Sequence, residues 1–409
     1  MDEKIEEILN RGTERIIDRE NLKNALLSGN KLRIKLGIDP TGPLIHLGRA
    51  TQLWKLKAFQ DLGHQIVLIV GDFTAQIGDP SDKPEGRKGK DEKTIKANAK
   101  QYLDQFSKVL NLKKVELRHN SEWLKKVDLK KFLEIANNFS VQQLIHRRNF
   151  FERWKSKEPI SLSEICYPLM QGYDSVMIKA DVELGGYDQL FNLKMGRIMQ
   201  RLYGQKPQDI ITLKMLDGLD GRKMSTSWGN VVNMLDKPND MYGKLMSMKD
   251  DMIYSYYELC SQIPSEELPN IKKKLEDSTI NPRDIKAELA KHLVELYNGS
   301  KAAEAAQAEF DNIFKNKQNP TEIRKLYCPK KEYNIIDLIV GLEFASSKSE
   351  AKRLIEQGGV RLLRIPKQGS RIDQEAIKDP KANIQIEEGL VVQVGKLNFA
   401  QLTFKELRP

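Results

Sequence analysis

Apolar and polar residues alternate between Ile34 and Ile38, a spacing that predicts a β-strand with one buried face. A turn rich in proline and glycine follows. Apolar residues then recur at steps of three up to Gly63, which predicts an amphipathic helix with a glycine stop. The continuous apolar run 66–70 predicts a second, buried strand. Together these segments form a βαβ unit, whose strands should be parallel and whose crossover should be right-handed.

The spacing of apolar residues divides the rest of the chain into segments that are expected to be helical or mixed α/β. Helical spacing is expected for residues 1–30 and for most of 95–155, and an α/β pattern returns at 165–235. Polar residues and two prolines at 316–329 predict a linker. After it come a serine-capped helix that ends at Gly358 and several short strands.

The predicted fold class is α/β, with a Rossmann-like parallel sheet, a following α-helical domain and a small α+β domain. The predicted domains are residues 1–235 with a helical insertion at about 95–165, residues 236–325, and residues 333–409.

Charge and cysteine content narrow the class of protein. The 67 basic and 57 acidic residues give a net charge of +10, which favours a polyanionic partner. Three widely separated cysteines offer neither a disulfide framework nor a CxxC metal site, so we expect a reduced, cytoplasmic protein. The acidic first residues are unlike a targeting peptide, and the longest apolar run is too short to span a bilayer. We therefore expect no membrane role.

The first candidate motif is the turn and helix start that follow the first strand. His46 and Arg49 are three residues apart and therefore share one helical face, and Gly48 leaves room for a flat ring against the backbone. The free N–H groups of a helix start favour a bound anion. The alternative is that His46 only caps the helix and Gly48 only permits close packing.

A second cationic segment lies far along the chain, between glycines. Its residues could close over a pyrophosphate leaving group as negative charge develops there. Alone, this pentapeptide would be taken for a solvated loop, but paired with the first motif it indicates ATP chemistry. The segment comprises Lys223, Met224, Ser225, Thr226 and Ser227.

A third pattern places polar groups on one face of a predicted helix. Tyr167, Gln171 and Asp174 follow an i, i+4, i+7 spacing. A carboxylate on an otherwise apolar face is costly unless it meets a partner. Asp174 could instead cap a helix, and Tyr167 could be a core aromatic residue.

The two cationic motifs resemble the HIGH and KMSKS signatures of class I aminoacyl-tRNA synthetases. The segments 167–174, 185–189 and 71–83 further resemble bacterial tyrosyl-tRNA synthetases, and the likeness extends over essentially the whole chain. The resemblance implies activation of L-tyrosine with ATP, release of pyrophosphate, and transfer of tyrosine to the 3′ end of tRNA(Tyr). It implies Mg²⁺ bound with ATP, no other cofactor and no protein-bound metal.

The resemblance also implies the roles of individual residues. The expected tyrosine-binding residues are Lys35, Gly37, Thr74, Asp79, Tyr167, Gln171, Asp174 and Gln189. The expected ATP-binding residues are Asp39, Thr41, His46, Gly48, Lys83, Arg87, Gly186, Asp188, Lys223 and Thr226. The expected catalytic residues are His46, Gly48, Arg49, Lys223, Ser225, Thr226 and Ser227.

Three positions depart from the pattern of that family. Arg49 replaces the second histidine of the first signature, which keeps positive charge but changes the contact. Thr226 replaces the second lysine of the other signature and removes a charge from the leaving phosphates. Lys35 stands where many relatives have a tyrosine that faces the phenol of the substrate.

The resemblance implies two further contacts. The tail is similar to a small RNA-binding module of the ribosomal S-four type, with the expected RNA-binding residues Lys348, Lys352, Arg353 and Arg361. The family is homodimeric, and the aromatic cluster at 139–154 is either a core helix or the subunit interface.

Two other functions remain open on the sequence alone. A tryptophanyl enzyme of the same class is disfavoured by Gln171 and Asp174, because an indole has one donor and no hydroxyl. A non-catalytic RNA-binding or sensor protein on the same frame is suggested by Thr226 and Arg49.

Overall fold

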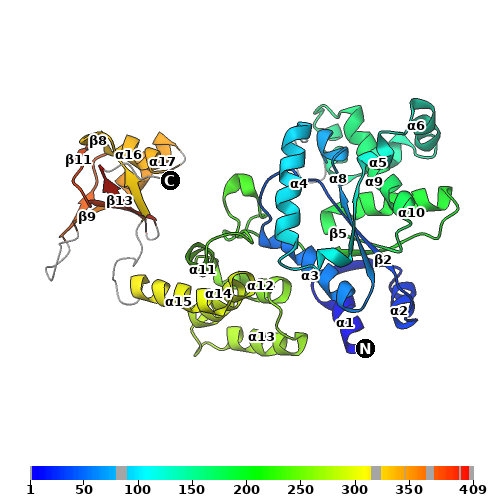
Figure 1. Ribbon diagram of the computed structural model, residues 1–409, viewed down its shortest axis with the longest axis horizontal. Coiled ribbons are helices and arrows are strands. Elements are labelled where there is room, and N and C mark those ends of the chain that lie inside the picture. The colour runs from blue at the N-terminus through cyan, green and yellow to red at the C-terminus, as the bar shows by residue number, and fades with distance from the viewer. Residues whose placement is uncertain are drawn as a thin grey trace. The chain divides into compact units, whose positions relative to one another are not determined.

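The computed structural model describes residues 2–79, 90–314, 324–345, 347–364, 373–395 and 398–404. They belong to two compact units, Met1–Glu304 and Ala305–Pro409, which are coloured blue to yellow and yellow to red in Figure 1. Lys83 and Arg87, expected near the phosphates, lie outside the described residues. In the described residues no helix is long and apolar enough to cross a membrane.

A six-stranded sheet forms the centre of the first unit. Its strands in spatial order are β1 (Thr13–Ile17), β6 (Asp209–Leu213), β5 (Val182–Gly186), β2 (Arg33–Ile38), β3 (Gln65–Val70) and β4 (Val115–His119). Only β1 is antiparallel to its neighbour. The predicted βαβ unit is β2, α3 (Leu47–Asp61) and β3, and its two strands pair in parallel. The α/β class with a parallel sheet is thus confirmed.

The order of the strands places a switch point between β2 and β5. The chain proceeds from β2 through β3 to β4 on one side, and from β5 to β6 on the other. Ligands of such sheets bind outside the carboxyl ends of the strands at the point where the order reverses. Asp39 directly follows β2, and Tyr187 directly follows β5.

Helices cover both faces of this sheet (Figure 1). The helices before residue 236 are α1 (Asp2–Asn10), α2 (Arg19–Leu27), α3, α4 (Glu92–Phe106), α5 (Ser121–Leu124), α6 (Leu129–Ala136), α7 (Val141–Ile145), α8 (Arg148–Lys155), α9 (Leu162–Ile178) and α10 (Leu190–Leu202). Val67 and Ile69 of β3 pack with Tyr167 and Met170 of α9. A capping box of Ser161 and Glu164 starts α9.

Helices follow the sheet in the chain, in the segment 236–325 that is expected to be α-helical. They are α11 (Pro238–Met246), α12 (Ile253–Cys260), α13 (Leu268–Glu276), α14 (Pro282–Asn298) and α15 (Ser300–Phe314). The Trp54 indole of α3 donates to the Tyr297 hydroxyl of α14 at 2.9 Å, and Arg11 donates to the carbonyls of Glu258 and Ser261. These contacts join the helical segment to the sheet within the first unit.

The helical spacing expected for residues 1–30 holds for α1 and α2 but is wrong for the segment between them. Gly12 adopts a positive φ of 59° and ends the first helical segment, and Thr13–Ile17 forms β1. Ile16 and Ile17 of this strand pair with Ile211 and Ile210 of β6. The apolar spacing of so short a segment does not distinguish a helix from a strand. Pairing with a distant strand therefore decided the local structure, which β-branched residues suit.

In its described residues, the second unit holds a five-stranded sheet, a two-stranded sheet and two helices that follow the end of α15. Its elements are β7 (Arg324–Tyr327), β8 (Glu332–Asn334), α16 (Ile335–Gly341), α17 (Lys348–Glu356), β9 (Val360–Arg364), β10 (Asp373–Ile377), β11 (Asn383–Gln385), β12 (Val391–Val394) and β13 (Asn398–Thr403). β7 lies inside the segment expected as a linker, and it pairs in parallel with β13. The expectation of a linker through residue 329 is therefore wrong. The polar composition there reflects an edge strand.

Candidate active site

The carboxylate of Asp39 connects two elements at the switch point. Its Oδ1 accepts a hydrogen bond from the Thr74 hydroxyl and its Oδ2 accepts one from the Tyr167 hydroxyl, both at 2.8 Å. Gly71 lies against this carboxylate, where an added Cβ would come within 1.9 Å of Asp39 Oδ1. Burial and the neighbouring carboxylates, Asp39 first, hold the pKa of Tyr167 well above its usual range, so this hydroxyl remains a donor.

Asp174 is a second buried carboxylate, on the same helix α9. It is 4% exposed, and its Oδ1 accepts from the Trp123 indole N–H at 2.8 Å. The Asn120 amide donates to Asp174 Oδ2 at 3.4 Å and to the Thr74 hydroxyl at 3.0 Å, which links the two carboxylates. Burial raises the pKa of Asp174 to about 7, against the lowering effect of nearby Lys35 and the two donors.

A third carboxylate, Asp79, lies among side-chain amides. The Gln189 amide donates to Asp79 Oδ2 at 2.7 Å, and Arg147 Nη2 lies 3.3 Å from Asp79 Oδ1. The buried Asn192 amide of α10 donates to both Gln171 and Gln189 at 2.9 Å. The three predicted residues Asp79, Gln171 and Gln189 are therefore held in one hydrogen-bonded group.

Lys35 lies beneath this group rather than in it. Its ammonium is fully buried and lies 2.7 Å from Glu183 Oε1. It also donates to the Gln171 carbonyl at 3.1 Å and to the Ser175 hydroxyl at 2.7 Å. The ammonium is thus saturated by the protein, on the α9 side of the sheet.

His46 occupies the N-cap position of α3, at the carboxyl-end side of β2, but its side chain makes no capping hydrogen bond. Burial, with a smaller contribution from the Arg49 charge, lowers the pKa of His46 to about 3, so the imidazole is neutral at ordinary pH. Its buried Nδ1 meets no hydrogen-bond partner among the described residues. Arg49 donates to the Tyr102 hydroxyl of α4 at 2.6 Å.

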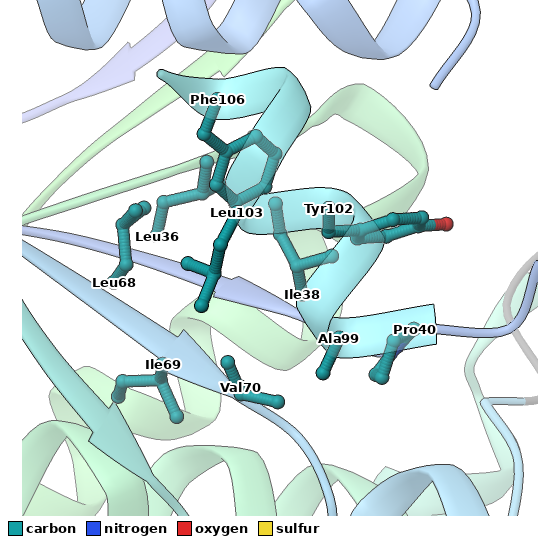
Figure 2. A pocket seen from close by; sticks show the side chains of 10 residues that line it. All are labelled: Leu36, Ile38, Pro40, Leu68, Ile69, Val70, Ala99, Tyr102, Leu103 and Phe106. Atoms are coloured by element: carbon teal, nitrogen blue, oxygen red, sulfur yellow. The ribbon is translucent and has the colours of Figure 1, made fainter. Parts of the chain in front are cut away.

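An apolar cavity separates this helix α4 from the sheet (Figure 2). It is lined by Leu36 and Ile38 of β2, by residues of β3, and by Tyr102, Leu103 and Phe106 of α4. With a lining made almost entirely of carbon, it offers no groups for a polar substrate. The polar cluster on the α9 side is therefore the candidate site.

The two cationic motifs approach each other. A Cβ added at Gly48 would lie 3.2 Å from both His46 Nδ1 and Met224 Sδ, so the second motif reaches the start of α3. His46 also forms a β-bridge with Asn233, a few residues after the second motif. Lys223 Nζ lies 3.8 Å from Asp188 Oδ2 just after β5. Among the described residues, the two motifs and Asp188 thus approach one another near the switch point.

Asn230 organises the loop that carries the second motif. Its side chain accepts from the Ser225 amide at 2.8 Å and donates to Asp220 at 2.8 Å and to the Lys223 carbonyl at 3.2 Å. Thr226 begins a single 3₁₀ turn that continues through Ser227 to Trp228. Lys223 is exposed at 46% of its side chain, which leaves its ammonium able to meet a ligand.

The other predicted residues lie on strand β2, at the ends of β2 and β5, and in the second unit. Gly37 is exposed, and a Cβ there would meet no atom within 4 Å, so the strand surface is open. The Thr41 amide donates to the Asp39 carbonyl in the turn after β2, and an added Cβ at Gly186 would lie 2.6 Å from Asp188 Oδ1. The four predicted RNA-binding residues belong to the second unit, on α17 and β9.

The cluster includes four side chains that the sequence analysis did not predict: Asn120, Trp123, Arg147 and Asn192. Asn120 directly follows β4, and its position at the carboxyl end of a parallel strand is a signal that could have identified it. Trp123 follows three residues later. Arg147 directly precedes α8 and lies between motifs, and nothing in the local sequence marks it.

The parallel sheet with paired cationic motifs at its switch point defines a nucleotide-binding fold of the class I synthetase type. Residues 27–315 match the family described as tRNA synthetases class I (W and Y). The chain belongs to this family.

Curated relatives match over nearly the whole chain. The tyrosine–tRNA ligase of Thermotoga maritima is 43% identical over 402 residues, covering 98% of each chain. The tyrosine–tRNA ligase of Moorella thermoacetica is 43% identical over 400 residues, covering 97% of this chain and 94% of its own.

Solved structures show the same fold at low identity. A truncated mitochondrial tyrosyl-tRNA synthetase of Aspergillus nidulans superposes with a TM-score of 0.63 at 22% identity, covering 77% of this chain and 95% of its own. The Archaeoglobus fulgidus tyrosyl-tRNA synthetase, solved with L-tyrosine, gives a TM-score of 0.61 at 22% identity, covering 75% and 99%.

Proposed function

We propose that the carboxylate cluster of α9 and the two cationic motifs together activate L-tyrosine for attachment to tRNA. The chain is a tyrosine–tRNA ligase: it joins tyrosine to ATP as tyrosyl-adenylate, releases pyrophosphate, and transfers tyrosine to tRNA(Tyr). The observation that carries the assignment of the site is Asp174. It is a buried carboxylate fixed by two donors, beside a second carboxylate cluster suited to an ammonium.

The proposed binding mode follows from the chemistry of tyrosine. Its phenol hydroxyl donates to the Asp174 carboxylate, and its ammonium meets Asp79, Tyr167 and Gln171. A site that pairs a substrate hydroxyl rejects the analogue that lacks it, because the site's own polar group is then left unpaired; tyrosine-specific synthetases are the usual illustration. An indole presents no hydroxyl, which disfavours the tryptophanyl alternative.

The proposed reaction needs no nucleophile from the enzyme. The substrate carboxylate attacks the α-phosphate in line, and the protein aligns the reactants and stabilises the leaving pyrophosphate. Asp39, Thr41, Gly186 and Asp188 are placed to hold the nucleotide at the ends of β2 and β5. The neutral imidazole of His46 donates one N–H to the phosphates without adding charge.

Around the leaving group, charge comes from the second motif. Lys223 leaves Asp188 and contacts the phosphates, while Ser225, Thr226 and Ser227 supply the short turn beside it. Arg49 braces the start of α3 through Tyr102. Mg²⁺ enters with ATP, held mainly by phosphate oxygens, and supplies charge neutralisation there. Since tRNA and ATP are its substrates, we place the enzyme in the cytoplasm.

The exchange of pyrophosphate into ATP tests the proposal directly. We expect exchange with tyrosine and none with tryptophan or without amino acid. D174A should lower kcat/KM for tyrosine by about 100-fold or more, the size of effect expected when a buried charged hydrogen bond to substrate is lost. Its circular dichroism spectrum should be unchanged.

A matched control is D209N, which alters another carboxylate whose pKa is raised, to about 6, on β6. It should leave tyrosine use intact. Unchanged kinetics in D174A would remove Asp174 from the site. No exchange with any amino acid would instead support a non-catalytic RNA-binding or sensor protein.

A further inference from the structure

A buried ion pair lies directly beneath the α9 face that carries Asp174. Lys35 of β2 and Glu183 of β5 are register partners on adjacent parallel strands, and their side chains are 0% and 1% exposed. Replacing such a pair by well-packed apolar residues is often neutral or stabilising. Stability alone therefore gives no reason for these two charges at this place.

Hydrogen bonds connect the pair to the helical turn that holds Asp174. Lys35 donates to the Gln171 carbonyl and to the Ser175 hydroxyl, and that hydroxyl donates to Glu183 Oε2 at 3.2 Å. Gln171 and Ser175 flank Asp174 in the sequence of α9. The Gln208 amide donates to Glu183 from the other side. The pair is thus fixed against the turn that presents the carboxylate.

The charges of the pair act on Asp174 with opposite signs. Lys35 favours its ionised form and lowers its pKa, while Glu183 disfavours that form and raises it. Tyr167 also couples to Asp174, but its own pKa is held high and it remains neutral. The remaining neighbours, Asn120 and Trp123, are neutral donors.

Other carboxylates act from farther away. Asp39 and Asp79 face Tyr167, through which their charges approach the same region. They belong to the proposed substrate cluster, whereas the donors that hold the Asp174 carboxylate are Asn120 and Trp123. Lys35 is therefore the cation that opposes the burial of Asp174.

We propose that Lys35 and Glu183 are a positioning pair that sets the charge of Asp174, and with it the pH range over which the tyrosine phenol is recognised. The inference rests on the proposed role of Asp174 in binding that phenol. An ionised carboxylate accepts a phenol hydrogen bond more strongly than a neutral carboxyl does. The pair would thus act on selectivity without touching substrate.

The test is the pH profile of kcat/KM for tyrosine in pyrophosphate exchange, which reports ionisations of the free enzyme. Removing the cation in K35Q raises the pKa of Asp174, so the acid limb should move up by about one pH unit. Removing the anion in E183Q should move it down. The neutral pair K35Q/E183Q should return the limb close to that of the wild type.

A matched control separates charge from damage to the fold. E164Q breaks another buried ion pair of the same helix, between Glu164 and Arg153 at 2.9 Å. Glu164 lies ten residues before Asp174, about 15 Å along the helix axis. It should leave the acid limb in place. Should K35Q fail to fold, E183Q and the neutral pair still decide the question.

D174N distinguishes the two proposals. If the acid limb persists in D174N, Asp174 does not produce it and the proposed phenol contact fails with it. If D174N abolishes the limb while K35Q and E183Q leave it unmoved, or move it in the same direction, only the role of the pair is overturned. Opposite shifts that disappear in the D174N background confirm the pair.

Discussion

At the scale of single residues, the site depends on the absence of a side chain at Gly71. Gly71 follows β3 and lies so close to Asp39 that no Cβ fits between them. Its φ is not in the left-handed region, so the requirement is for space and not for backbone freedom. The Asp39 carboxylate accepts hydrogen bonds from the hydroxyls of Thr74 and Tyr167. A Cβ at residue 71 would therefore disturb all three side chains.

We therefore predict that G71A weakens the enzyme through Asp39. The new methyl group must push Asp39 Oδ1 and Thr74 Oγ1 away, because it would lie 1.9 and 2.4 Å from them. Overpacking of this kind costs about 1–3 kcal/mol of stability. Urea unfolding should show that loss, and the KM for ATP should rise in pyrophosphate exchange.

G63A is a useful comparison for steric crowding, since a Cβ at Gly63 meets no atom within 4 Å. Its positive φ of 91° makes it costly for stability alone. We expect a lower unfolding midpoint with unchanged KM for ATP. Equal KM values in G71A and the wild type would refute the role assigned to Gly71.

At the scale of elements, helices α6 to α8 present apolar side chains outward. Phe150 is fully buried, whereas Phe151 is 38% and Trp154 62% exposed on α8. The cluster at 139–154 is therefore part core and part surface. The other exposed apolar residues of this region are Leu129, Leu133, Val141 and Leu162. We propose that a second copy of the chain covers this face, as the family resemblance implies.

If the protein is a dimer, sedimentation equilibrium should give a mass of twice 47.0 kDa. W154E places a charge on the proposed interface and should shift the equilibrium towards a single chain, because an unpaired buried charge opposes association. L202E is the control, with a leucine 45% exposed on α10. A wild-type chain that sediments as a monomer would exclude the interface.

The apolar spacing predicted helices and strands correctly where the structure of a segment depends mainly on its own residues. The βαβ unit at 34–70 follows from apolar spacing and Gly63, and Tyr167, Gln171 and Asp174 do share α9. Pairing between distant segments carries no local signal. β1 became visible only as the partner of β6, and Lys35 finds Glu183 because β2 and β5 are neighbours. For that reason the sequence suggested a substrate contact for Lys35, while the structure gives it a buried anion.

At the scale of the whole molecule, the net charge of +10 includes exposed cations of the second unit. Lys352 and Arg353 on α17 are exposed, and their ion pairs with Glu356 and Glu350 are long, at 3.8 and 3.9 Å. Exposed pairs of this kind contribute little stability. Exchanging them for phosphate contacts would therefore cost the protein little.

We predict that these cations bind tRNA phosphates without reading sequence. Each lost phosphate contact lowers the salt dependence of binding, by about 0.7–0.9 in the slope of log K against log salt. K352Q/R353Q/R361Q should reduce that slope by about 2 in a tRNA filter-binding titration. Tyrosine-dependent pyrophosphate exchange should be unchanged, because adenylate formation does not involve tRNA.

The control removes the same charge elsewhere, from three exposed lysines of α4 in the variant K93Q/K96Q/K100Q. If binding depended on net charge alone, both triple variants would lose equal slope. A larger loss in the variant of α17 and β9 assigns the phosphate contacts to the second unit. Equal losses would mean that the positive charge of the whole chain, and not this surface, attracts tRNA.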